Sequence, residues 1–111
     1  MIKNPILPGF NPDPCICRKG EDYYMAVSSF EWFPGIPVYH SKDLKNWELY
    51  SHVLTDDVAV DLKKLPSAKG IWAPCLTYCE KEDLFCNTSS KFFFTISALN
   101  SVPSVNFTFI C

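Results

Sequence analysis

The chain has 111 residues, of which 48% are hydrophobic and 20% charged, a globular balance that argues against general disorder. This length suits one small domain or a piece of a larger one. Ten Lys and Arg face twelve Asp and Glu without a basic run, so we expect no nucleic-acid partner. No apolar run approaches the ~18 residues of a membrane span. The N-terminus shows no basic-then-apolar signal peptide, so we expect no membrane partner and a cytoplasmic location.

Nine prolines and 15% aromatic residues disfavour a helical bundle and favour short strands joined by turns. Aromatic and β-branched stretches predict four strands, within residues 16–18, 23–29, 38–41 and 47–54. A meander of four antiparallel strands is the unit of a propeller blade, and one blade cannot bury both faces alone. A further strand is expected to begin within residues 70–79. The sequence therefore predicts an all-β fold with one blade and part of a second.

The cysteines allow three interpretations. They stand at positions 15, 17, 75, 79, 86 and 111. An even count in a short chain is typical of a disulfide framework, but that needs an oxidising compartment. The spacing lacks the Cys-x2-Cys pairs of zinc sites, so we expect no metal and no cofactor. Reduced, mostly buried thiols are the favoured interpretation, with disulfides or a metal site as alternatives.

The composition changes sharply near Cys86. Residues 1–86 hold 21 of the 22 charged residues and every Gly, Tyr and Trp, whereas residues 87–111 hold one charge, five Phe and five Ser. By propensity this tail offers strands within 91–97 and 105–110. We interpret residues 1–86 as the N-terminal part of a propeller and residues 87–111 as an aberrant tail, produced by a frameshift, a mis-spliced exon or a broken gene model. Its two N-x-[ST] sequons are taken as chance matches.

One carboxylate stands in an unusual context. Asp13 lies between Pro12 and Pro14, and proline fixes φ and removes a backbone donor. A carboxylate on so stiff a segment suits a group that must hold a water molecule in a fixed place. The alternative is an Asx-type turn residue, and the spacing alone favours that alternative.

Four ordered motifs resemble the N-terminus of a glycoside hydrolase family 43 β-xylosidase, of the type that removes xylose, and often arabinofuranose, from short xylo-oligosaccharides. The resemblance covers about residues 3–85. The motifs are NPILPGFNPDP (residues 4–14), DYY (22–24), SSFEWFPGIPVYHSKDLKNW (28–47) and GIWAPCLTY (70–78).

The resemblance implies a five-bladed β-propeller with a central pocket and hydrolysis with inversion. Such a reaction uses a general base, a general acid and a third carboxylate that tunes the site. Asp13 matches the general base, and Phe30 and Trp72 match aromatic residues that wall the pocket around the terminal sugar. Aromatic walls bury the apolar faces of a sugar and exclude water, although by residue type alone Phe30 and Trp72 would more often be plain packing. The expected partner is a xylo-oligosaccharide substrate.

Two departures from the family pattern matter. Cys15 stands where the family commonly has a small hydroxyl residue, and a thiol is a weaker hydrogen-bond partner that would loosen a contact to Asp13. The general acid and the tuning carboxylate lie on later blades in the family, and residues 87–111 contain no Asp or Glu. Since loss of the acid costs on the order of 10²–10⁴-fold, we expect the chain alone to be inactive or nearly so.

Three functions therefore stay open. The favoured one is a truncated glycosidase that hydrolyses O-glycosyl bonds as a β-xylosidase when complete. The second is a non-catalytic xylose- or xylan-binding remnant in which Phe30 and Trp72 still contact sugar. The third is a small disulfide-bonded interaction protein. The sequence assigns no chemistry to His40 or Asp43, and it leaves Trp32, Phe33 and Trp47 as packing or loop residues.

Overall fold

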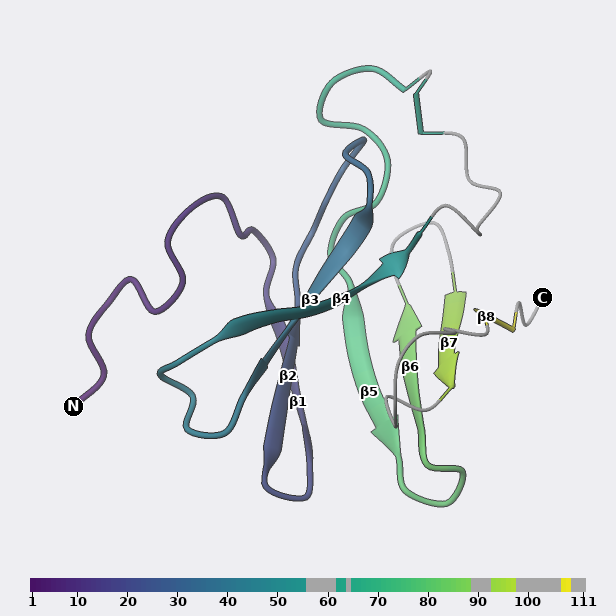
Figure 1. Ribbon diagram of the computed structural model, residues 1–111. Coiled ribbons are helices and arrows are strands. Elements are labelled where there is room, and N and C mark those ends of the chain that lie inside the picture. Colours follow the sequence, from purple (N-terminus) through teal and green to yellow (C-terminus); the bar gives the residue numbers. More distant parts are fainter. Residues whose placement is uncertain (56–61, 64, 89–92, 98–106, 109–111) are drawn as a thin grey trace.

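The computed structural model describes residues 1–55, 62–63, 65–88, 93–97 and 107–108. Within these residues the chain is all-β and forms two four-stranded sheets, β1-β2-β3-β4 and β5-β6-β7-β8, with no helix (Figure 1). In this described part, accordingly, no helix is long and apolar enough to cross a membrane.

The first sheet is an antiparallel meander. Its strands are β1 (Cys15–Lys19), β2 (Asp22–Ala26), β3 (Gly35–Ser41) and β4 (Glu48–Leu54). All four expected strands are confirmed, but two of their ends differ by three residues. β3 begins earlier than expected because Gly35 pairs with Leu54. β2 ends at Ala26 because the N–H of Ser28 donates to Pro12 and the N–H of Ser29 donates to Ile71, which takes the chain out of the ladder.

The second sheet repeats the pattern. Its strands are β5 (Cys75–Cys79), β6 (Leu84–Thr88), β7 (Phe93–Ser97) and β8 (Phe107–Thr108). The strand expected within residues 70–79 is therefore confirmed as β5, with residues 70–74 serving as a loop before it. β7 and β8 fall within the two stretches of the tail where propensity favoured strands.

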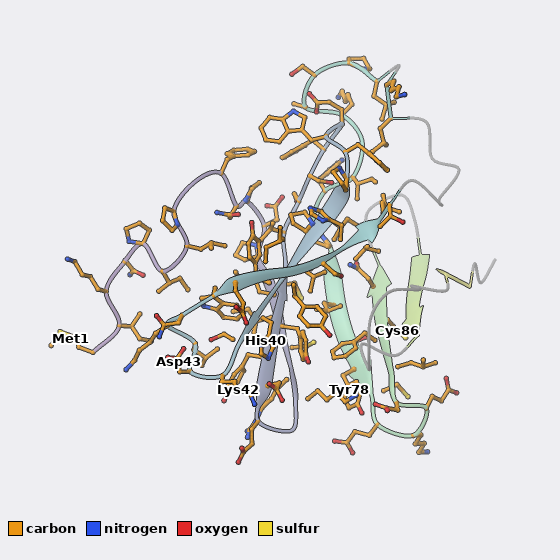
Figure 2. All side chains as sticks on the ribbon, viewed as in Figure 1. Met1, His40, Lys42, Asp43, Tyr78 and Cys86 are labelled. Carbon is orange, nitrogen blue, oxygen red and sulfur yellow. The ribbon has the colours of Figure 1, made fainter. Side chains whose placement is uncertain are left out.

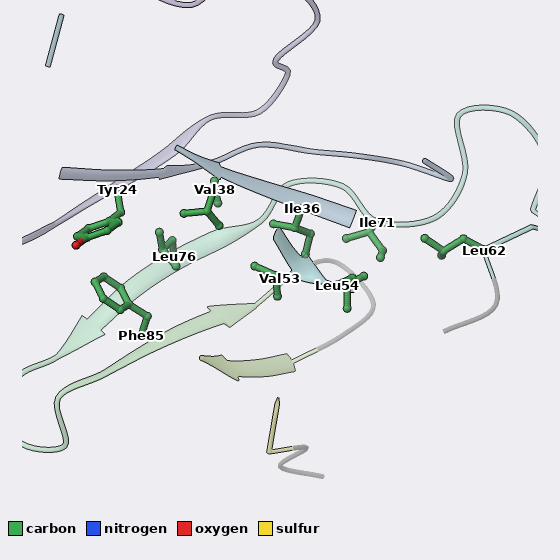
Figure 3. Packing of buried hydrophobic residues seen from close by; sticks show 10 residues of the cluster. Tyr24, Ile36, Val38, Val53, Leu54, Leu62, Ile71, Leu76 and Phe85 are labelled. Atoms are coloured by element: carbon green, nitrogen blue, oxygen red, sulfur yellow. The ribbon is translucent and has the colours of Figure 1, made fainter. Parts of the chain in front are cut away.

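The two sheets pack on a shared core (Figure 3). The core takes buried residues from both sheets and from the segment that joins them: Tyr24, Ala26, Ile36, Val38, Val53, Leu54, Leu62, Ile71, Leu76 and Phe85. The Phe85 ring is fully buried and lies 4.8 Å from the Tyr24 ring in an edge-to-face arrangement. Because each sheet covers the apolar face of the other, the second sheet buries a face that a single blade would leave open to water.

A polar contact closes the same interface at the hairpin ends. Lys19, at the end of β1, lies 2.5 Å from Asp83 in the turn before β6, and the Tyr78 hydroxyl donates to Asp83 at 2.7 Å. The Lys19 ammonium also lies over the Tyr78 ring, 5.0 Å from its centre. The hydrogen bond from Lys19 holds the pKa of Asp83 below its usual 3.8.

This contact predicts a pH dependence. Since the pKa of Asp83 is lowered on folding, its pairing stabilises the fold at neutral pH and is lost as the pH falls below about 4. Asp83→Asn should lower the melting temperature near pH 7, and the difference from the parent chain should close between pH 4 and pH 2. Thermal unfolding followed by circular dichroism measures this, with Glu82→Gln in the same turn as control. A difference that persists unchanged at pH 2 would contradict the assignment.

The first residue of the predicted tail conflicts with its surroundings. Asn87 on β6 is fully buried, and neither its amide nitrogen nor its carbonyl oxygen has a hydrogen-bond partner. Natural sequences rarely leave a buried polar side chain without a partner, because its desolvation is not compensated. A polar residue in an apolar position is a mismatch between sequence and fold. The origin of residues 87–111 stays a prediction.

Replacing Asn87 should stabilise the chain. Asn87→Val removes two unpaired polar atoms and introduces a good strand former, so we expect the free energy of unfolding to rise by about 1–3 kcal/mol. Urea denaturation measures the change. Thr77→Val, at an exposed position on the neighbouring β5, is the control and should change little. A loss of stability in Asn87→Val, with the control unchanged, would mean that the amide has a partner in solution.

Candidate functional site

Asp13 lies exposed just before β1 and takes a left-handed backbone conformation, with φ of 50°. Such a φ is uncommon for a residue other than glycine, and it persists only where the surroundings impose it. The Ser28 hydroxyl supplies one such constraint by donating a hydrogen bond to Asp13 Oδ2 at 2.6 Å. The carboxylate is thus open to solvent on one side and fixed on the other.

Ser28 joins three segments of the chain. Its side chain is buried, at 4% exposure, and its backbone N–H donates to Pro12 at 3.0 Å. Its hydroxyl oxygen also accepts the backbone N–H of Ala73 at 2.8 Å. Because the Ala73 N–H occupies an acceptor position of the hydroxyl, the hydroxyl proton is directed toward Asp13. The orientation of the carboxylate therefore depends on the loop before β5.

Phe30, between β2 and β3, is held against that loop by a pair of backbone hydrogen bonds. Its N–H donates to Ile71 at 2.8 Å, and its carbonyl accepts the Ile71 N–H at 3.1 Å. Phe30 also has a left-handed φ, of 50°. Its half-buried ring stacks on Phe10 at 6.0 Å, and Phe10 contacts Trp32 at 5.8 Å. Phe10 and Trp32 are 63% and 61% exposed, so this aromatic group faces solvent.

Trp72 stands between two anchored neighbours. Ile71 is fully buried and paired with Phe30, and Ala73, with φ of 51°, is bonded to Ser28. Trp72 itself is 45% exposed. The hydrogen bonds of residues 28–30 and 71–73 therefore bring the segments of Asp13, Phe30 and Trp72 together, although the three belong to different parts of the sequence.

Two residues of this site were missed by the sequence analysis. The sequence analysis places Ser28 within a strand. Its burial beyond the end of β2 depends on the loop of residues 70–74, which packs on it and which the local sequence does not reveal. Phe10 was given no role, although it lies in the first motif. Trp32 and Phe33, interpreted as packing or loop residues, lie in the loop between β2 and β3 and are 61% and 43% exposed. Trp47 does pack, and its indole N–H donates to Leu44 at 3.2 Å.

Cys15 does not have the contact expected of it. Its thiol lies against β5, where Cys15 Sγ accepts the Leu76 N–H at 3.2 Å and donates to the Leu76 carbonyl at 3.7 Å. The hydroxyl beside Asp13 comes from Ser28 instead. The five described cysteines are free, and burial raises the pKa of the Cys17 thiol to about 12. Among the described residues, no three potential metal ligands gather.

His40, on β3, and Asp43, in the turn after it, have structural contacts away from Asp13 (Figure 2). His40 Nε2 lies 2.6 Å from Asp22 Oδ1, joining β3 to β2, and this hydrogen bond lowers the pKa of Asp22. Asp43 accepts the backbone N–H groups of Lys45 and Asn46 at 2.9 and 2.8 Å. These bonds to the carboxylate hold the pKa of Asp43 far below its usual value and close the turn after β3.

Gly70 allows the close approach that this geometry needs. It has φ of 107°, and a Cβ there would lie 2.4 Å from the Phe30 carbonyl oxygen. Gly70→Ala should therefore break the Phe30–Ile71 pair and cost more than the ~1–2 kcal/mol of a left-handed alanine alone. Gly20→Ala is the matched control, because Gly20 has φ of 61° and open space around it. Equal losses for the two variants in urea denaturation would contradict the close approach.

The fold and the site define a class of protein. Two successive four-stranded antiparallel sheets are blades of a β-propeller, and an exposed carboxylate beside exposed aromatic rings is typical of a sugar-processing site. The model of glycosyl hydrolases family 43 matches residues 2–102, and the chain belongs to this family.

Individual relatives agree with the family. The chain is 60% identical over 79 residues to "Beta-xylosidase" of Bacillus subtilis (strain 168), covering 71% of this chain and 15% of the relative. It is 56% identical over 78 residues to "Xylosidase/arabinosidase 43B" of Humicola insolens, covering 70% of this chain and 14% of the relative. The chain thus spans about 15% of the length of these curated relatives.

Solved structures of the family share this fold. A xylan β-1,4-xylosidase from Bacillus halodurans C-125 superposes with a TM-score of 0.75 at 41% identity, covering 89% of this chain and 21% of that one. The GH43 protein BlXynB from Bacillus licheniformis gives a TM-score of 0.76 at 38% identity, covering 94% of this chain and 20% of that one. The chain therefore holds an incomplete part of a glycosidase β-propeller.

Proposed function

We propose that this chain forms the general-base side of an inverting β-xylosidase site that acts on the terminal sugar of xylo-oligosaccharides. The observation that carries the proposal is the hydrogen-bonded chain from Ala73 through Ser28 to Asp13, which leaves one face of the carboxylate open to solvent. The names of the similar proteins, xylosidases and xylosidase/arabinosidases, support the substrate class.

Asp13 would act on water. In an inverting glycosidase the base removes a proton from a water molecule as its oxygen attacks the anomeric carbon, while an acid ~6.5–9.5 Å away protonates the leaving oxygen. The Ser28 hydrogen bond to Oδ2 fixes the carboxylate and leaves Oδ1 available for the water. Phe30 and Trp72 would bury the apolar faces of the sugar and keep other water molecules out.

The general acid has no counterpart among the residues that resemble the family. Residues 87–111 contain neither Asp nor Glu. Glu31, the carboxylate next to Phe30, accepts the backbone N–H of Ala68 at 3.1 Å and so supports the loop. We therefore propose that the 111-residue chain by itself is inactive or nearly so, since proton donation to the leaving group contributes on the order of 10²–10⁴-fold.

A chimera tests the role of Asp13. The matching segment of the Bacillus subtilis relative is replaced by residues 1–79 of this chain, and hydrolysis of an aryl β-xyloside is measured. The chimera should be active and should release xylose of inverted configuration, as followed by NMR. Asp13→Asn should lower its kcat on the order of 10²–10⁴-fold, while Glu21→Gln, in the exposed turn between β1 and β2, leaves kcat unchanged. An active Asp13→Asn chimera would refute the role of general base.

A second function, sugar binding without catalysis, is favoured by the exposed aromatic rings. Phe10 and Trp32 are more than 60% exposed beside Phe30, and Trp72, next to the Ile71 that pairs with Phe30, is 45% exposed. Titration calorimetry of the 111-residue chain with xylobiose distinguishes it. Tyr50→Ala, on the distant strand β4, is the control. Binding that is lost in Trp72→Ala but kept in Tyr50→Ala would show a sugar site that does not require catalysis. If xylobiose releases no binding heat with the parent chain, a sugar-binding remnant is excluded.

A further inference from the structure

Two cysteines occupy equivalent positions in the two blades. Cys15 is the first residue of β1, and Cys75 is the first residue of β5. β1 and β5 belong to different sheets but lie against each other at the interface between the blades (Figure 1). The two cysteines therefore begin strands that are neighbours across an interface, although 60 positions of sequence separate them.

The contacts of Cys15 place its sulfur beside Cys75. Cys15 Sγ is within 3.2 Å of the Leu76 nitrogen and 3.7 Å of the Leu76 oxygen, and Leu76 directly follows Cys75. Burial raises the pKa of the Cys15 thiol, and the neighbouring Cys75 thiol raises it further. Cys75 is exposed and Cys15 is half-buried, so Cys75 is the more accessible of the two.

We propose that Cys15 and Cys75 are a modification site, where a hydroperoxide forms a reversible disulfide bond that joins β1 to β5 beside Asp13. The exposed Cys75 sulfur attacks the peroxide O–O bond and becomes a sulfenic acid, with an alcohol or water as leaving group. The Cys15 sulfur then attacks the Cys75 sulfur, the S–S bond forms and the sulfenic oxygen leaves as water. Two thiols are oxidised by two electrons in total, and one peroxide is reduced.

The remaining described thiols are poorer partners. Cys17 lies on β1 with Cys15, but burial raises its pKa to about 12, so almost no thiolate forms at neutral pH. Cys79 lies at the far end of β5 from Cys75, and Cys86 lies on β6. The peroxide is therefore expected to react first at the exposed Cys75, and Cys15 is expected to form the disulfide because it lies beside Cys75.

The bond would form between the two segments that carry the candidate site. Asp13 lies two residues before Cys15, and Ala73, whose N–H holds Ser28, lies two residues before Cys75. A disulfide would fix these segments covalently where hydrogen bonds through Ser28 now hold them. The proposal requires only the pair of thiols and stands whether or not Asp13 is a general base.

The experiment uses the reduced 111-residue chain and hydrogen peroxide. After oxidation, free thiols are alkylated and peptides are mapped by mass spectrometry without reduction. We expect a loss of two thiols, a single Cys15–Cys75 cross-link, and recovery of both thiols with dithiothreitol. Cys15→Ser and Cys75→Ser should each abolish the cross-link, while the matched control Cys79→Ser retains it.

Two further measurements keep the outcome decisive. Circular dichroism checks that each serine variant keeps its strands, and oxidation in urea shows whether the selectivity needs the fold. Cross-links spread equally over several cysteine pairs in the folded chain would overturn the proposal. Six free thiols after peroxide treatment would overturn it too, as would a Cys75→Ser chain that still loses two thiols.

Discussion

The Ser28 side chain is the contact on which the arrangement of this molecule depends. Its hydroxyl links Asp13, just before the first blade, to Ala73, just before the second, over sequence separations of 15 and 45 residues. The neighbouring backbone bonds of Ser29 and Phe30 to Ile71 continue the same crossing. Without it the two sheets would still share apolar residues and the contact of Cys15 with Leu76, but Asp13 would lose the hydrogen bond that orients its carboxylate.

Backbone strain accumulates at this crossing. Asp13, Phe30 and Ala73 all have a φ near 50°, although none is glycine. Each such residue costs of order 1–3 kcal/mol, and it is retained only where packing and hydrogen bonds impose it. Here the surrounding core imposes it, because Ile71, Ile36 and Leu54 are fully buried next to the crossing. The packed core of the two blades thus keeps the loop before β5 in a strained conformation. Through Ser28, that loop orients the Asp13 carboxylate.

The strands could be predicted from the sequence because their signals are local. Aromatic and β-branched stretches located β1 to β5, and the ordered motifs placed Asp13, Phe30 and Trp72. What the sequence could not supply were contacts over long separations. By sequence Ser28 is one more strand residue, and its role follows only from the hydrogen bond that the Ala73 N–H donates to it. Likewise, the Cys15 thiol accepts a hydrogen bond from Leu76, 61 residues away. The end of β2 was misjudged for the same reason, since a tertiary bridge overrides local propensity there.

The contacts that orient Asp13 bear on what part of a propeller can do by itself. Orientation of Asp13 requires only residues of the first blade and the loop that enters the second, all within the described chain. Protonation of a leaving group requires a second carboxylate on the other side of the sugar, several ångströms away. The proposed base can therefore be oriented independently of an acid. The proposed sugar-binding function needs no acid either, since the hydrogen bonds of Ser28 hold Asp13 and the loop that carries Trp72 without one.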